Sequence, residues 1–387
     1  MTMADMTNEL VRAQKPSDIL GFNAEISAIE GIVKLTLGEP DFPTPDHVKQ
    51  AAIRSIEADL SHYTPSRGLR TLRQAAAGFL HERYGVSYDP DSQVLVTAGA
   101  TGGIYSVLTA VLNPADTVLI PTPIFPLYIP IARMAGGRTV LMDTSDDGFV
   151  LTPDKLEAAI QSDPEHAKVL VLNFPTNPTG VTYTREQLEA LAVVARRHDL
   201  IVLSDEIYSE LTYEGAHVSM GEVLPERTIV LNGVSKSHAM TGWRIGIAAG
   251  PADLIEQVGK VSEFSITCAT ANAQYAALEA FANGRDDAEP MRRAYQRRRD
   301  FMVTALREAG LGVIDPQGAF YLFVELSERM KDSWKFAYSL AREAKVALIP
   351  GASFGPGGDG YVRLSYAASM EDLRTAAGRI NHYMGTH

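Results

Sequence analysis

The chain has 387 residues, and its 45% hydrophobic and 21% charged residues are typical of an ordered globular protein of about two domains. Its formal net charge of −12 argues against nucleic acid or an anionic membrane surface as the main partner. A single cysteine, Cys268, predicts neither a disulfide nor a cysteine metal site, and we expect no bound metal. No stretch approaches the ~18 apolar residues of a membrane span, so the sequence favours a cytoplasmic location.

Short apolar runs predict strands that are buried on both faces of a sheet: 93–97, 117–120, 139–142, 168–173, 200–205 and 228–232. Amphipathic helices are expected between them. One carries its apolar stripe from Ile104 to Leu112, and another opens at Thr184 with Gln187 three residues on, a capping-box pattern. This alternation predicts an α/β fold with a mostly parallel sheet flanked by helices.

A different rhythm begins near residue 286, where a long charged helix to about residue 309 precedes the strand-like segments 318–326 and 360–366. This pattern predicts a smaller α+β domain. We expect residues 46–285 to form the large, ligand-binding domain. Residues 1–45 and 286–387 would form the small domain, with the N-terminal segment packing on the C-terminal unit.

The residues that follow the predicted strands are the candidates for chemistry, because ligands of such sheets bind beyond the carboxyl ends of the strands. The glycine-rich turn 98–103 opens a helix and offers N–H groups to an anion, although a tight turn alone would also explain it. Asn177 stands in a proline-rich loop, where an ordinary turn asparagine is the alternative. Asp205, with Tyr208 three residues on, is costly to bury unless a cation meets it.

Lys236 follows the last predicted strand, and Arg244 lies eight positions further along. A partly desolvated lysine has a lowered pKa and can attack a carbonyl to form a Schiff base. The glycine-rich turn and Arg244 suit a phosphate, and Lys236 suits an aldehyde. Asp205 suits a basic ring nitrogen, and Asn177 and Tyr208 suit a phenolic oxygen. Together these groups describe pyridoxal 5′-phosphate.

Six segments spread over nearly the whole chain carry a family resemblance: "LGEPDFPTP" (37–45), "HYTPSRGLRTLR" (62–73), "NPTG" (177–180), "SDEIY" (204–208), "SKSHAMTGWRIG" (235–246) and "YVRLSY" (361–366). They resemble, in order, the motifs of the fold type I, pyridoxal-phosphate-dependent class I aminotransferases. The aspartate and aromatic aminotransferase branch is the most similar.

The resemblance implies a role for each matching residue. Lys236, Asp205 and Tyr208 would be catalytic, with Lys236 as the Schiff-base lysine. The further cofactor-binding residues would be Tyr63, Ala100, Thr101, Phe125, Asn177, Ser235 and Arg244. Gly38, Asn177 and Arg363 would bind the substrate. Tyr63 would reach the phosphate of the neighbouring subunit, which implies a homodimer with shared active sites.

The chain departs from the family pattern at two places. Gly233 stands where the family often has a hydroxyl that contacts the phosphate, so Ser235 is a candidate replacement. No residue matches the arginine that binds a side-chain carboxylate in some aspartate-specific relatives.

The resemblance implies transfer of the amino group of an L-amino acid, aromatic or related or possibly aspartate, to a 2-oxo acid, with 2-oxoglutarate expected. The alternatives on the same fold are an N-acetyl-diaminopimelate aminotransferase and a C–S β-lyase. A nonenzymatic, DNA-binding regulator is disfavoured by the acidic chain, and a nucleotide-dependent dehydrogenase by the lack of a GxGxxG motif.

Overall fold

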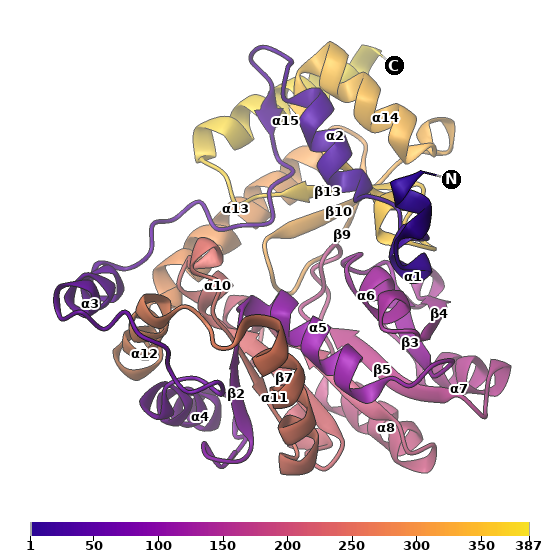
Figure 1. The fold of residues 1–387 in the computed structure, drawn as a ribbon. Helices are drawn as coiled ribbons and strands as arrows, with labels where there is room; N and C mark the ends of the chain where they lie inside the picture. The colour runs from indigo at the N-terminus through magenta and orange to yellow at the C-terminus, as the bar shows by residue number, and fades with distance from the viewer. Residues whose placement is uncertain (1, 387) are drawn as a thin grey trace.

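The computed structural model describes residues 2–386, and a seven-stranded sheet forms the centre of its lower half (Figure 1). The strand order is β2 (Val94–Thr97), β8 (Gly246–Ala249), β7 (Thr228–Gly233), β6 (Ile201–Asp205), β5 (Ala167–Asn173), β3 (Thr117–Thr122) and β4 (Arg138–Asp143). Neighbours are parallel except around β8, which runs antiparallel to β2 and β7. The predicted strands and the mostly parallel sheet are confirmed. The prediction lacks β8, because a run of glycine, isoleucine and two alanines carries little strand signal.

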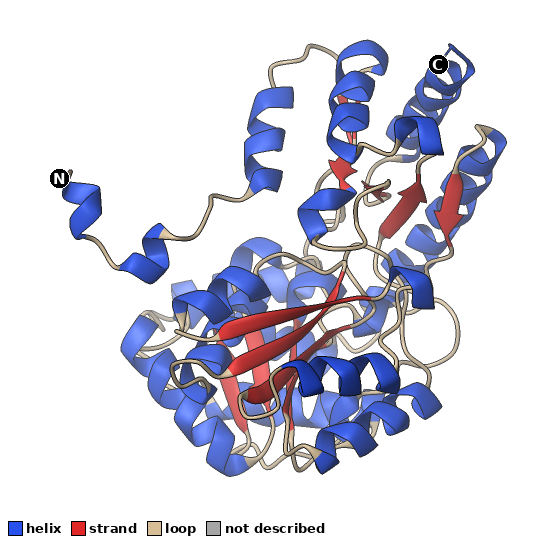
Figure 2. Cartoon of the chain, turned by 90° about the vertical axis from the view of Figure 1, so that its right-hand side faces the viewer, coloured by secondary structure: helices blue, strands red, loops and turns tan. Residues whose placement is uncertain are grey.

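Helices cover both faces of this sheet, as Figure 2 shows. On one face lie α5 (Gly99–Val111), α6 (Tyr128–Met134) and α11 (Ala252–Ile266). On the other face lie α7 (Pro153–Ser162), α8 (Arg185–Arg197) and α9 (Met220–Val223). A third cluster packs against β2 and β8 and contains α3 (Asp46–Glu57), α4 (Arg70–Tyr84) and α12 (Ala271–Asn283).

Two predicted helix starts can be compared with the structure. The capping box at Thr184 is present, since its hydroxyl accepts from the N–H of Gln187 and the Gln187 side chain accepts from the N–H of Thr184. By contrast, α5 begins at Gly99 rather than near Ile104. The glycine-rich segment is therefore itself the first turn of the helix, which places its free N–H groups directly at the strand end.

A second, antiparallel sheet lies in the upper half of Figure 1, with strand order β12 (Ile349–Pro350), β13 (Tyr361–Ser365), β10 (Tyr321–Glu325) and β9 (Gly312–Ile314). Around it lie α2 (Asp18–Ile26), α13 (Ala288–Glu308), α14 (Ser333–Ser339) and α15 (Met370–Thr386). β1 (Val33–Lys34) pairs in parallel with β11 (Val346–Ala347), so the N-terminal segment joins this C-terminal unit. The predicted small domain requires this packing of the N-terminal segment on the C-terminal unit. The domain boundaries at residues 45 and 285 stay a prediction.

The remaining elements are short. They are α1 (Glu9–Arg12), α10 (Val234–Ser237), the single-turn helices η1 (Met3–Met6), η2 (Ser145–Asp147), η3 (Ser209–Leu211), η4 (Thr241–Trp243), η5 (Glu328–Met330) and η7 (Gly351–Phe354), and the π-helical turn η6 (Leu340–Ala344). Within residues 2–386, no helix combines the length and the hydrophobicity that a membrane span requires.

Candidate functional site

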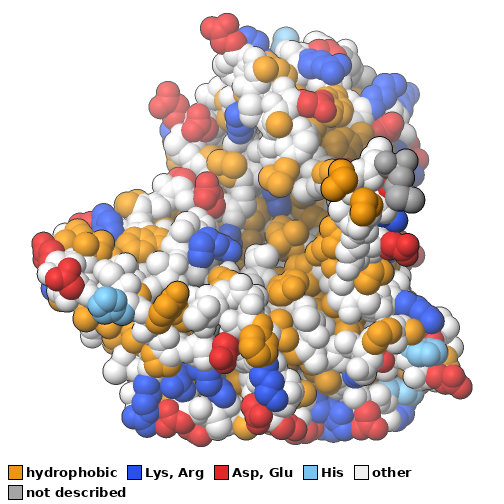
Figure 3. All heavy atoms as spheres, in the orientation of Figure 1, with side chains coloured by type: hydrophobic (Ala, Val, Ile, Leu, Met, Phe, Trp, Pro, Cys, Tyr) orange, Lys and Arg blue, Asp and Glu red, His pale blue; other side chains and the backbone are white. Residues whose placement is uncertain are grey.

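A cavity of about 310 Å³ lies where the carboxyl ends of β5, β6 and β7 meet the second sheet and α2. The face seen in Figure 3 is hollowed between the upper and lower parts of the molecule. The predicted site residues that line this cavity are Gly38, Ala100, Thr101, Phe125, Asn177, Asp205, Tyr208, Ser235, Lys236, Arg244 and Arg363. Tyr63 is the exception, because its side chain is 86% exposed and lies at another surface, beside Cys268.

The cavity also has lining residues for which the sequence predicts no role in the site: Ile19, Leu20, Asn23, Thr36, Leu37, Ile104, Tyr128, Asn173, Ile207, Thr241 and Tyr321. Ile19, Leu20 and Asn23 come from α2 and Tyr321 comes from β10, far in the sequence from the predicted strand ends, and no local pattern marks these four. Most of the others lie in or beside segments already of interest, such as Asn173 at the end of β5 and Thr241 in the segment 235–246.

Lys236 lies on α10, directly after β7, with its amine inside the cavity wall. Its Nζ donates a hydrogen bond to the carbonyl oxygen of Gly38 over 2.6 Å. Burial lowers the pKa of Lys236 to about 8, from an ordinary value of 10.5. An amine with this pKa is partly neutral near neutral pH, so it can act as a nucleophile and as a proton acceptor.

Asp205 ends β6 with only 3% of its surface exposed. Oδ2 accepts a hydrogen bond from the Tyr128 hydroxyl over 2.6 Å, and Oδ1 accepts from the N–H of Ile207 over 3.2 Å. Burial raises the pKa of Asp205 to about 6 against these two hydrogen bonds. No cationic side chain among residues 2–386 forms an ion pair with Asp205. A protonated ring nitrogen is the kind of partner that this buried carboxylate fits.

Arg244 lies over the first turn of α5. Its Nη1 donates to the carbonyl oxygen of Thr241 over 2.7 Å, and it forms no ion pair with any carboxylate that the structure describes. Gly99 has a φ of +70°, and a Cβ at that position would lie 2.5 Å from Nη2 of Arg244. Glycine is thus required for the guanidinium to approach the helix N-terminus. A guanidinium and a helix N-terminus at one point fit a phosphate group.

Close packing also favours glycine at position 233, where the family often has a residue with a hydroxyl group. A Cβ there would lie 3.1 Å from the Cα of Gly246 and 3.1 Å from the carbonyl oxygen of Ile245. The ends of β7 and β8 pair at these two glycines. Ser235, two residues on, is buried and lines the cavity, so it is available as a hydroxyl for the phosphate.

Arg363 is 3% exposed and projects from β13 into the same cavity. Nη1 donates to Oδ1 of Asn177 over 2.9 Å, and Nη2 donates to the carbonyl oxygen of Thr36 over 2.7 Å. The guanidinium carbon lies 4.5 Å from the ring centre of Tyr321. Burial lowers the pKa of Arg363, but a guanidinium stays charged. Because its hydrogen bonds go to neutral oxygens, the charge is available for a ligand carboxylate.

Tyr208 and Asn177 are each held at the cavity by a hydrogen bond to a neighbouring side chain. The Tyr208 hydroxyl lies 2.8 Å from the Tyr321 hydroxyl, and the N–H of Asn177 donates to Oδ1 of Asn173 over 3.2 Å. Nδ2 of Asn173 in turn donates to the carbonyl oxygen of Asp205 over 3.1 Å. Both predicted partners of the phenolic oxygen are therefore held at the cavity by hydrogen bonds from neighbouring elements.

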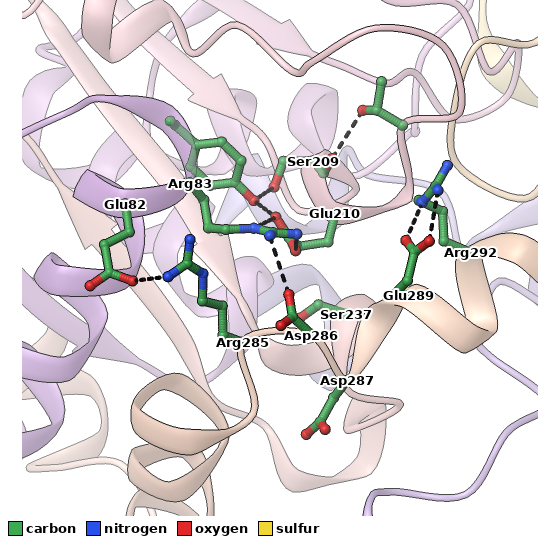
Figure 4. A network of polar contacts seen from close by, with 12 residues as sticks. Glu82, Arg83, Ser209, Glu210, Ser237, Arg285, Asp286, Asp287, Glu289 and Arg292 are labelled. Atoms are coloured by element: carbon green, nitrogen blue, oxygen red, sulfur yellow. Dashed lines mark hydrogen bonds and ion pairs between the residues drawn. The ribbon is translucent and has the colours of Figure 1, made fainter.

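An ion-pair network anchors η3, the single-turn helix that directly follows Tyr208 (Figure 4). Arg83 of α4 donates to both carboxylate oxygens of Glu210 in η3, over 3.1 and 2.5 Å. Arg83 also lies 3.6 Å from Asp286, just before α13. Glu210 is 8% exposed, so this bidentate pair is shielded from water and holds η3 against α4.

The fold and the cavity together define a class of protein, an enzyme that holds pyridoxal 5′-phosphate and an amino acid. Residues 30–380 match the family model of aminotransferase class I and II, and the chain belongs to this family.

Curated relatives cover almost the full length. A Bacillus subtilis protein described as "Probable N-acetyl-LL-diaminopimelate aminotransferase" is 41% identical over 99% of this chain and 96% of its own. The "Aspartate/prephenate aminotransferase" of Thermus thermophilus is 41% identical over 97% of this chain and 98% of its own. The solved structure of aspartate aminotransferase from Thermus thermophilus with maleate has a TM-score of 0.92, at 41% identity, over 97% of this chain and 99% of that one.

The predicted fold class, enzyme class and cofactor are thereby confirmed. The protein is a pyridoxal-phosphate-dependent aminotransferase, and its substrates are amino acids and 2-oxo acids.

Proposed function

We propose that this aminotransferase takes its amino group from an L-amino acid with an aromatic or otherwise apolar side chain. The observation that carries this proposal is the charge of the cavity wall. Its basic residues are Lys236, Arg244 and Arg363. We assign them to proton transfer, the cofactor phosphate and the substrate α-carboxylate, so none is left for a second carboxylate. The wall left for a substrate side chain contains the half-buried Ile19, beside which the second carboxylate of a short acidic side chain would lose hydration without gaining a partner, whereas Leu20 and Leu37 lie at the exposed mouth. The names of the relatives include both acidic and aromatic substrates and do not decide the question.

When bound, pyridoxal phosphate supplies an aldehyde for the amino group and a ring that accepts the electrons of the broken Cα–H bond. Arg244, Ser235 and the first turn of α5, at Ala100 and Thr101, would hold its phosphate. Asp205 would keep a proton on the ring nitrogen, and Phe125 would stack on the ring. Asn177 and Tyr208 would donate hydrogen bonds to the phenolic oxygen.

Lys236 would move the proton. Its amine, with a pKa near 8, would first accept the proton from the substrate Cα as a base. It would then donate that proton again as an acid. Arg363 would bind the substrate α-carboxylate, with Asn177 and the backbone of Gly38 beside it, and so fix which hydrogen faces Lys236.

The acceptor that we propose is 2-oxoglutarate. Its distal carboxylate is one carbon farther from the reacting carbon than that of aspartate, so it reaches toward the open mouth of the cavity. Leu20 and Leu37 at this mouth are 70% and 50% exposed, so water is available there.

We also infer a homodimer. Tyr63 is 86% exposed, and large apolar side chains of α3 and α11 are exposed too, among them Ile56 at 58% and Phe264 at 87%. A second copy that covers them would place Tyr63 at the partner's phosphate. A cytoplasmic location stays a prediction from the sequence.

A substrate panel tests the proposal. Purified enzyme with pyridoxal phosphate and 2-oxoglutarate is assayed with phenylalanine, tyrosine, leucine and aspartate. We expect kcat/KM for the aromatic donors to exceed that for aspartate at least about tenfold, since an unpaired buried charge costs more than ~1.4 kcal/mol. A clear preference for aspartate would refute the proposed substrate class. Lys236→Ala serves as the inactive control, and full turnover in that variant would refute the role of Lys236.

A further inference from the structure

Three buried polar atoms in the cavity wall have no hydrogen-bond partner in residues 2–386: Oδ1 of Asn23, Oγ1 of Thr36 and Nε of Arg363. Buried polar atoms are nearly always paired, so each exception needs an explanation. The substrate α-carboxylate proposed above accounts for Nε of Arg363. Nothing in the proposed transamination uses Asn23 or Thr36.

Asn23 is held in place by the helix that carries it. α2 docks through Phe22 and Ile26, and the ring of Phe22 lies 5.1 Å from that of Tyr338 in an edge-on contact. Ile19 is one turn before Asn23, so the two side chains lie on the same side of α2. Both line the cavity. Asn23 is thus a polar group at the end of an apolar wall.

Thr36 is held just as firmly and is 2% exposed. Its neighbour Leu35 donates from its N–H to the carbonyl oxygen of Ala347 over 3.0 Å, which continues the β1–β11 pairing. Its own carbonyl oxygen accepts from Nη2 of Arg363 over 2.7 Å. The carbonyl group of Thr36 and the N–H of Leu35 are therefore engaged, and the hydroxyl of Thr36 is left for a ligand.

We propose that Asn23 and Thr36 form a polar subsite that recognises a hydrogen-bond donor on an otherwise apolar substrate side chain. The inference rests on the proposed function and narrows its substrate class. Oδ1 of Asn23 can only accept, so the α-carboxylate, which is also only an acceptor, cannot satisfy it. The substrate α-amino group would be taken up by the aldehyde of pyridoxal phosphate. What remains is a donor in the side chain, either a phenolic hydroxyl or the N–H of an acylated side-chain amine.

Binding of unreactive acids tests the subsite without turnover. 3-(4-Hydroxyphenyl)propionate and 3-phenylpropionate differ in one hydroxyl and lack the amino group. Their dissociation constants are measured by calorimetry on the pyridoxal-phosphate-loaded wild type, Asn23→Leu, Thr36→Val and the control Glu25→Gln, on the same helix but outside the cavity. We expect about tenfold tighter binding of the hydroxylated acid to wild type and control, and a ratio near one in both subsite variants. A ratio that is equal in all four proteins overturns the proposal.

Kinetics distinguish the two sources of the donor. kcat/KM is compared for tyrosine against phenylalanine and for N6-acetyl-lysine against norleucine. The pair whose discrimination is lost in Asn23→Leu identifies the donor. Because Thr36→Val preserves shape, it carries the test alone if Asn23→Leu does not fold. Wild type that treats both pairs alike, while still favouring them over aspartate, overturns the subsite and leaves the proposed function intact. Wild type that prefers aspartate refutes the proposed function, and the binding ratio still reports on the subsite.

Discussion

The hydroxyl of Tyr128 donates a 2.6 Å hydrogen bond to Oδ2 of Asp205, and both side chains are buried. Tyr128 begins α6 on one face of the sheet, whereas Asp205 ends β6 in its middle. The hydrogen bond fixes the orientation of the Asp205 carboxylate in the cavity wall. It also favours the charged form of Asp205, which burial disfavours.

Replacing Tyr128 with phenylalanine should raise the pKa of Asp205 above its value of about 6, since a donor to the charged form is lost. Asp205 is charged above its pKa, so the affinity for pyridoxal phosphate should fall on the acid side of this value. In Tyr128→Phe this fall should begin at higher pH, with severalfold weaker binding at pH 7. Fluorescence titration of the apoprotein from pH 5 to 8.5 measures it. Tyr105→Phe, at a half-exposed tyrosine, is the control, and coincident profiles for the two variants would contradict the role of Tyr128.

Lys236 should determine how fast the apoprotein reacts with pyridoxal phosphate. Its pKa of about 8, lowered from 10.5 by burial, means that the amine loses its proton as pH rises through 8. The rate should therefore increase with pH and level off above about pH 9. Stopped-flow absorbance between pH 6 and 10.5 gives the profile. A rate that keeps rising to pH 10 would show an ordinary, solvated lysine, and Lys236→Arg should not react at all.

Much of the fold and most of the site could be predicted from the sequence, for a physical reason. The central strands are buried on both faces, so they are unbroken apolar runs, and the polar residue that ends each run stands out. The sequence predicts Asp205 and Lys236 as site residues in this way. β8 lacks such a run, and Tyr128, Tyr321 and Thr36 contact the site across large separations in sequence, as in the 113-residue separation of Tyr208 and Tyr321. Contacts of this kind depend on how the two sheets pack, which no local pattern records.

Gly99 should not tolerate alanine. Its φ is +70°, and a Cβ would lie 2.5 Å from Nη2 of Arg244. The left-handed backbone alone costs about 1–2 kcal/mol, and displacement of the guanidinium should weaken pyridoxal phosphate binding about tenfold or more. Thermal unfolding and cofactor titration measure the two effects separately. Gly78→Ala in α4 is the matched control, because a Cβ there meets nothing within 4 Å and alanine favours a helix. Equal behaviour of the two variants would contradict this account of the phosphate site.

Subunit mixing tests whether Tyr63 serves the partner's cavity. Tyr63 is 86% exposed and lies outside the cavity of its own chain. Tyr63→Phe should bind pyridoxal phosphate about tenfold more weakly, since a hydrogen bond to a charged phosphate is lost, and Lys236→Ala should be inactive. In a mixed dimer, the Tyr63→Phe chain keeps Lys236 and receives an intact Tyr63 from the Lys236→Ala chain. One site of wild-type cofactor affinity should therefore form per mixed dimer.

To form mixed dimers, the two proteins are unfolded and refolded together, and sedimentation confirms the dimer. Activity is then assayed at limiting cofactor. Activity no higher than that of Tyr63→Phe alone, in a mixture shown to contain mixed dimers, would mean that Tyr63 does not cross between subunits.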